Sequence, residues 1–214
     1  MKNLFFIFIL ALLFSGCIGT KNIEITKNVL TQMNGKTIVV TQYQEPDFIA
    51  KTTDSVILGR KAKEVMIREG NKIIKDNNIQ NPVHYIKKNF IKKLSEKTSF
   101  TTVLSTDIEP SNDFATLINK YSDKDYILDI KTDNWKLTYF TWDWNVYKVI
   151  YTVKLRLINT KNGDLIESTC SSIPENIKTA PPYSKFLENN AQILKDELQL
   201  AADKCLNEFS KDIF

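Results

Sequence analysis

Few side chains in this chain of 214 residues could carry out acid–base chemistry. Asp129, Asp133 and Asp143 lie near one predicted hairpin, and paired carboxylates can hydrolyse glycosidic bonds. The single histidine, His84, lies in the first turn of a lysine-rich segment, where it could cap a helix or titrate. A simpler interpretation is that the three aspartates lie on the solvent-exposed side of strands or in loops, and that the histidine lies at the surface. We therefore predict that the protein is not an enzyme.

Other signatures of chemistry are missing from the sequence. It contains no Gly-x-Ser-x-Gly, no phosphate-binding glycine loop and no His-Glu-x-x-His. Cys170 and Cys205 lie far apart in the sequence, and with the one histidine they cannot complete a tetrahedral metal site without carboxylates, so we predict no metal and no cofactor. The formal net charge of +4 is too balanced to argue for a nucleic-acid partner.

The most informative cysteine is Cys17, because of the residues before it. A positive start at Lys2 is followed by an unbroken apolar run, Leu4 to Phe14, and then by Ser15 and Gly16. This order is typical of a secretory signal peptide, and the run is too short to cross a bilayer. The small-small-Cys ending resembles the lipobox of bacterial lipoproteins, which implies that Cys17 is lipidated and becomes the first residue. The alternatives are an ordinary cleaved signal peptide and, less favoured, a retained membrane anchor.

The same resemblance implies an address in the cell envelope. Two or more acyl chains anchor a protein stably in a membrane, as palmitate and related chains do. Ile18 stands where an Asp would favour retention in the inner membrane, so we expect the outer membrane, with the body in the periplasm. We divide the chain into a signal peptide (1–16), a lipidated tether (17–36) and one periplasmic domain (37–214).

Export also bears on the two remaining cysteines, Cys170 and Cys205. Two cysteines in an oxidising compartment predict one disulfide. Two buried free thiols are the alternative.

Two groups of side chains could form a contact surface. Lys87, Lys88 and Lys92 belong to a lysine-rich helix, which is either a solvated face or a patch for anionic lipid or protein. Tyr139, Trp142 and Trp144 belong to an aromatic run near a hairpin. Such rings either fill the core or form a patch for a partner, a membrane surface or a sugar, since Trp and Tyr suit interfaces with one wet edge.

The elements that must position these residues follow from periodicity. Asn81-Pro82 is a helix start, and apolar residues then recur at helical spacing to Leu94. Residues 146–160 alternate as a half-buried strand, and Asn162-Gly163 predicts a hairpin to a partner strand at 165–171. We further expect strands at 37–44, 99–105 and 126–132, helices at 113–121 and 183–209, and an ambiguous segment at 54–78 that Gly59 and Gly70 could break. The fold class is α+β, an antiparallel or mixed sheet with helices packed on a face, in a single domain.

The segment from Tyr126 to Cys170 resembles a family of uncharacterised bacterial envelope lipoproteins. The matching pieces are Asn134-Trp135, the run Leu155-Arg156-Leu157 on the following strand, Cys170, and a second cysteine in the closing helix, here Cys205. The resemblance implies architecture and location but no activity. More distantly, the layout is similar to the curli-secretion lipoprotein, the TolB amino-terminal domain and the penicillin-binding-protein activator lipoproteins, as a fold analogy only.

Taken together, the sequence predicts a membrane-anchored lipoprotein that acts as a non-enzymatic accessory or assembly component of an envelope complex, through contact with an envelope protein. The alternative is a glycan- or small-ligand-binding lipoprotein that uses the aromatic run 139–144.

Overall fold

The computed structural model describes residues 27–213 and contains one mixed sheet of six strands. Its strands are β1 (Lys36–Tyr43), β2 (Ile49–Lys51), β3 (Phe100–Glu109), β4 (Tyr126–Phe140), β5 (Asp143–Asn159) and β6 (Leu165–Ser172). The order across the sheet is β3-β1-β4-β5-β6, and the short β2 pairs with the far half of β4. Pairings among β1, β2, β3 and β4 are parallel, whereas β4, β5 and β6 form an antiparallel meander.

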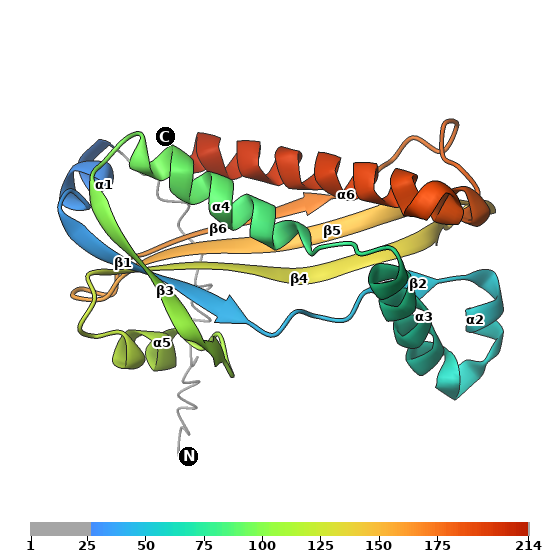
Figure 1. The fold of residues 1–214 in the computed structure, drawn as a ribbon, viewed down its shortest axis with the longest axis horizontal. Coiled ribbons are helices and arrows are strands. Elements are labelled where there is room, and N and C mark those ends of the chain that lie inside the picture. The colour runs from blue at the N-terminus through green and yellow to red at the C-terminus, as the bar shows by residue number, and fades with distance from the viewer. Residues whose placement is uncertain (1–26, 214) are drawn as a thin grey trace, which may run out of the picture.

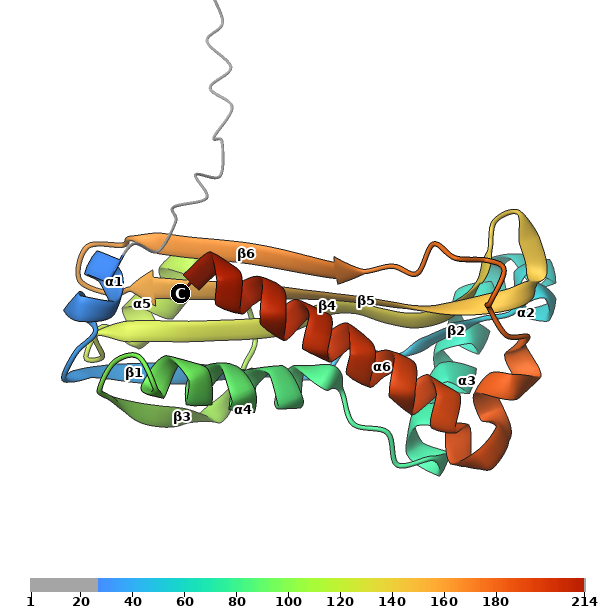
Figure 2. The same ribbon diagram turned by 90° about the horizontal axis from the view of Figure 1, so that it is seen from above.

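Helices cover both faces of this sheet (Figures 1 and 2). They are α1 (Lys27–Gln32), α2 (Thr53–Ile57), the 3-10 turn η1 (Gly59–Lys61), α3 (Ala62–Asp76), α4 (Pro82–Ser95), α5 (Phe114–Lys120) and α6 (Tyr183–Ile213). Helices α4 and α6 pack on one face over the main core, and α5 packs on the other with Leu117 against Val39 and Ile127. The predicted α+β fold class is confirmed.

Strand β5 shows how the alternating pattern builds the core. Its odd-numbered residues from Tyr147 to Leu157 are buried among the helices, and the side chains between them are less buried up to Lys154. Antiparallel pairing to β4 along almost its whole length, and to β6 on its other side, makes β5 an interior strand of the sheet. Burial of one face by α4 and α6 therefore accounts for the period of two in the sequence.

The folded body begins earlier than the predicted boundary at residue 37. Residues 27–32 form α1, Met33 is fully buried, and β1 starts at Lys36. Only the part of the predicted tether before Lys27, with Cys17, lies outside the described residues.

The ambiguous segment 54–78 is helical. Gly59, with φ of +56°, separates α2 from the next helix, but Gly70 does not break α3. A Cβ at Gly70 would lie 2.0 Å from the carbonyl oxygen of Phe48, so glycine is required there for α3 to approach β2. The closing helix is also interrupted, because Glu188 to Ala191 have non-helical dihedral angles. Leu187, beside that interruption, is 37% exposed, whereas Phe186 is buried.

Candidate functional site

The aromatic run lies at the tip of the β4–β5 hairpin. Phe140 pairs with Asp143, so Trp142 projects from a tight turn and its side chain is 92% exposed. The Asp143 carboxylate accepts hydrogen bonds from the backbone and side-chain nitrogens of Asn145, at 2.9 and 3.0 Å. Trp144 donates from Nε1 to the Thr141 carbonyl at 3.2 Å and is 61% exposed. The turn is thus fixed by its own polar groups, and both indoles stay at the surface.

A series of ring contacts connects this tip to the core. Trp144 packs on Tyr139 with ring centroids 5.8 Å apart, and Tyr139 meets Tyr147 edge-on at 6.1 Å. Tyr147 is buried and contacts Tyr183 of α6 at 5.2 Å. Each such pair contributes about 0.5–1.5 kcal/mol beyond the area that it buries. Each interpretation of the aromatic run therefore holds for part of it. Phe140 is buried in the core, whereas Trp142 and Trp144 are exposed and available for contact.

Helix α2 lies at the same end of the molecule (Figures 1 and 2). Its chain enters from β2, which pairs with β4 up to Thr138, close to the hairpin tip. Ile57 is 83% exposed and Leu58 49% exposed. We call Ile57, Leu58, Trp142 and Trp144, which are exposed at this end of the molecule, the apolar end. Large exposed apolar patches mark interaction surfaces in soluble proteins.

The three candidate lysines are not equivalent. Asn81 caps α4 by accepting a hydrogen bond from the Val83 nitrogen at 3.1 Å. The face of α4 that meets the core is the one with the buried side chains of Val83, Ile86, Phe90 and Leu94. Lys88 and Lys92 then lie at the surface, but Lys87 is partly buried and donates to the Thr41 carbonyl at 2.7 Å. Burial lowers the pKa of the Lys87 ammonium, partly offset by Asp129 and Glu45. A solvated lysine face is therefore the wrong description of Lys87.

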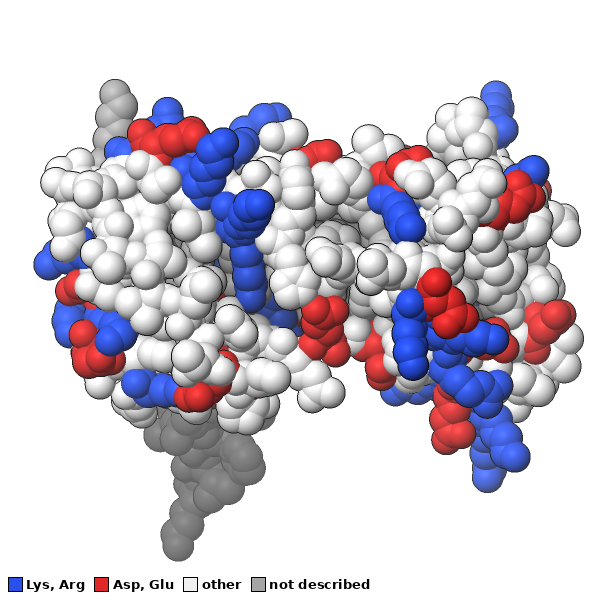
Figure 3. All heavy atoms as spheres, in the orientation of Figure 1, with Lys and Arg blue, Asp and Glu red and all other residues white. Residues whose placement is uncertain are grey.

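Lys87 borders a groove of about 660 Å³ between α4 and the β3 edge of the sheet. Figure 3 shows lysine and arginine side chains running from α4 down toward the sheet beside a hollow in this face. No feature of the sequence identified this groove, because β1, β3, β4 and α4 meet there only in the folded chain.

Asp129 belongs to a buried ion pair on the α5 side of the sheet rather than to an acid–base site. Its carboxylate accepts hydrogen bonds from Thr41 at 2.8 Å and from Arg156 Nε at 2.7 Å. A second guanidinium nitrogen of Arg156 also donates to Asp129, and Asn112 accepts from it at 2.8 Å. Both charges are nearly inaccessible, with Asp129 3% and Arg156 6% exposed. Their mutual satisfaction indicates a structural role.

The structure does not bring the four acid–base candidates together. His84 pairs with Glu45 at 2.6 Å on the surface, a partner that sequence spacing did not predict. Asp129 is occupied by Arg156, Asp133 is exposed, and Asp143 bonds within its own turn. Within residues 27–213, no group of three or more His, Cys, Asp or Glu side chains could hold a metal ion.

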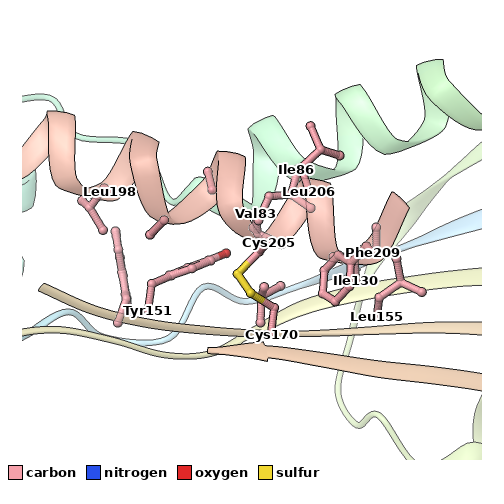
Figure 4. Packing of buried hydrophobic residues seen from close by; sticks show 14 of the residues in the cluster. Val83, Ile86, Ile130, Tyr151, Leu155, Cys170, Leu198, Cys205, Leu206 and Phe209 are labelled. Atoms are coloured by element: carbon pink, nitrogen blue, oxygen red, sulfur yellow. A yellow bond between two sulfur atoms is a disulfide. The ribbon is translucent and has the colours of Figure 1, made fainter. Parts of the chain in front are cut away.

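The predicted disulfide is present between Cys170 on β6 and Cys205 on α6 (Figure 4). Both cysteines are buried, in the core that β5 shares with α4 and α6. The bridge attaches the closing helix to the outermost strand of the meander. The alternative of two free thiols is excluded.

Cys17 and its predicted lipid lie outside the described residues. Over the part of the chain that is described, every helix is too short or too polar to cross a membrane.

Comparisons with known proteins find similar structures but no sequence family. No protein-family model and no curated protein matches the chain. A Xanthomonas campestris protein of the DUF330 family has a TM-score of 0.40 and 8% identity, over 84% of each chain. PelC of Paraburkholderia phytofirmans, described as a dodecamer, has a TM-score of 0.32 and 10% identity, over 79% of this chain and 87% of its own. Lipoprotein GNA1162 of Neisseria meningitidis has a TM-score of 0.28 and 14% identity, over 82% of this chain and 98% of its own. At such scores these likenesses carry no argument about function.

Proposed function

We propose that this protein is an exported, lipid-anchored component of a bacterial cell envelope that acts without catalysis, as an accessory or assembly subunit. It contacts a protein partner through the apolar end. The observation that carries this proposal is the exposure of Trp142 and Trp144, at 92% and 61%, on a turn that hydrogen bonds hold in one conformation.

The chemistry of the apolar end suits a protein partner. Tryptophan is among the residues that contribute most to binding energy in protein interfaces, particularly near the centre of a contact. The ring contacts from Trp144 through Tyr139 to Tyr147 hold the surface in place before binding. A preorganised surface loses less conformational freedom on association, so more of the contact energy remains as affinity.

The position of the apolar end also supports this role. Strand β5 has 17 residues, and α1 lies at the opposite end of the sheet from the hairpin tip (Figure 1). At about 3.3 Å per residue, the tip is roughly 55 Å from the end at which the described chain begins. A body standing on a lipid at Cys17 would present Trp142 away from its own membrane, toward other envelope proteins.

Replacing Trp142 and Trp144 together by Ser is expected to abolish a specific envelope crosslink without unfolding the protein. Both side chains are mostly exposed, and we expect their loss to change the melting temperature little. The measurement is chemical crosslinking in cells, followed by mass spectrometry of the crosslinked species.

Leu200→Ser is the matched control, because Leu200 on α6 is also an exposed apolar residue, at 63%. It should leave the crosslink unchanged. An undiminished crosslink in the double tryptophan variant, or no reproducible partner for the unmodified protein, would contradict the proposal.

A second candidate is a glycan- or small-ligand-binding role for the same patch, favoured by the ring of Tyr139 beside the exposed indole of Trp144. Trp135 is 2% exposed, so a ligand at the patch would act mainly on the fluorescence of Trp142 and Trp144. Tryptophan fluorescence that stays constant across a panel of muropeptides and sugars would exclude this candidate.

A further inference from the structure

The groove beside α4 has the size and lining of a small-molecule site. Its volume of about 660 Å³ lies within the range of about 300–1,000 Å³ that ligand pockets occupy. Val40 and Ile130 form part of its lining from the sheet, with Ile91 from α4 and Leu104 from β3. Leu104 is 61% exposed on β3, which is an edge strand with a neighbouring strand on one side only. These apolar side chains would be covered by an apolar part of a bound ligand.

Two lining residues, Tyr43 and Asn81, each have a buried polar side-chain atom with no hydrogen-bond partner in the described chain. Asn81 is 2% exposed, and its Oδ1 accepts hydrogen bonds from the Val83 nitrogen at 3.1 Å and from the Thr132 hydroxyl at 2.7 Å. These two donors fix the orientation of the amide, so Nδ2 carries the hydrogens. Within the described chain Nδ2 donates to nothing. Buried donors are nearly always hydrogen-bonded in folded proteins, and Asn81 lines both the groove and a smaller hollow beside α6.

The charges around the groove are mainly positive. Lys87 and Lys88 lie along it on α4, and Lys131 enters from β4 with its ammonium 5.1 Å from the centre of the Tyr43 ring. The one carboxylate in the lining, Glu45, is paired with His84. Among residues 27–213 none of the three lysines forms an ion pair.

Lys87 is the most constrained of these cations. Its ammonium donates to the Thr41 carbonyl, which leaves two further N–H groups at the wall of the groove. Taking an ammonium out of water is unfavourable, and Asp129 and Glu45 offset that cost only partly. An anion in the groove would supply a counter-charge in direct contact with Lys87.

We infer that this groove binds an anionic amphiphile with a single apolar chain. The anionic group lies against Lys87 and the Asn81 amide, and the chain lies along Val40, Ile91 and Leu104. The lining residues of α4 run from Asn81 to Ile91, a length of about 15 Å at 1.5 Å per residue, which suits a chain of medium length.

The test is photolabelling of the full chain in a neutral detergent, with decanoic acid that carries a diazirine near its methyl end. Adducts are mapped by mass spectrometry and are expected on the groove segments of β1, β3 or α4. Unlabelled decanoate should compete, whereas decanol and inorganic phosphate should not, because each lacks one half of the recognised chemistry. Adducts confined to other segments, or competition by decanol equal to that by decanoate, would overturn the inference.

Lys87→Met keeps most of the side-chain volume and removes the charge, and it is expected to reduce labelling by at least about tenfold. Lys75→Met, an exposed lysine in the last turn of α3, is the matched control and should label like the unmodified chain. Equal labelling of the Lys87 and Lys75 variants would overturn the assignment.

Asn81→Asp provides an independent variant, because it keeps the cap acceptor of α4 and replaces the free donor by a carboxylate. It should also lose labelling, and full labelling of this variant would contradict the role of Nδ2. Trp142→Ser with Trp144→Ser should label normally, so failure of this inference and failure of the proposed function give different results.

Discussion

Replacing Cys170 and Cys205 together by Ala is expected to lower the free energy of unfolding by about 4 kcal/mol. The bridge closes a loop of 35 residues, and in the chain-entropy model a crosslink of this length restricts the unfolded chain by roughly that amount. For a domain of this size, about 1 kcal/mol corresponds to 2–4 °C, so the melting temperature should fall by about 8–16 °C. Thermal unfolding followed by circular dichroism measures the change.

Reductant provides the control for the disulfide prediction. It should lower the melting temperature of the unmodified protein toward that of the double alanine variant and leave the variant itself unchanged. Alkylation without reductant should likewise add no mass at Cys170 or Cys205. A double variant within about 1 kcal/mol of the unmodified protein would show that α6 is held by packing alone.

Arg156→Met is expected to destabilise the protein by about 3–5 kcal/mol. The substitution leaves the Asp129 carboxylate 3% exposed without its cation, and removing one partner of a buried pair has an effect of this size. The Asn112 carbonyl would lose one partly buried hydrogen bond from a neutral acceptor, so most of the expected loss of stability comes from the unpaired Asp129 carboxylate. Urea unfolding at neutral pH gives the free energy directly.

The double variant Asp129→Leu with Arg156→Met separates charge from packing. It removes both charges, and we expect it to recover most of the stability that Arg156→Met loses, because a buried pair is often replaceable by apolar residues. If Arg156→Met alone changes the free energy of unfolding by less than about 1 kcal/mol, the pair does not have the structural role assigned to it.

Much of the fold follows from local signals. Asn81-Pro82 starts α4 as predicted, since an amide cap and a proline without N–H both suit a first turn. Alternation along β5 predicts a half-buried strand, and Gly163 takes a positive φ of 75° in the connection to β6. The disulfide follows from counting cysteines in an oxidising compartment. In each case the signal lies within a few residues or in the composition.

What the sequence did not predict depends on contacts between distant segments. Met33 follows α1, whose residues are mostly polar, and nothing in this local sequence predicts that its side chain is buried. Met33 is fully buried because it packs into the core formed by the sheet and the helices. From the sequence alone, Gly70 predicts a break in the helix. In the folded chain Gly70 lies within α3, where the close backbone of Phe48 leaves no room for a side chain. Lys87 is adjacent to Lys88 in the sequence, but the rotation of α4 turns Lys87 toward the Thr41 carbonyl. Partly for the same reason, the groove beside α4 has no sequence signature.

The central claim, that the apolar end contacts an envelope protein, is tested most directly by a photocrosslinking amino acid placed at Trp142 in the living cell. Trp142 is 92% exposed at the hairpin tip, and Leu200 on α6, at 63%, is the matched position. We predict that ultraviolet light links position 142 to one envelope protein reproducibly and leaves position 200 unlinked. Crosslinks from position 142 to lipid alone, or equal crosslinking from both positions, would contradict the account.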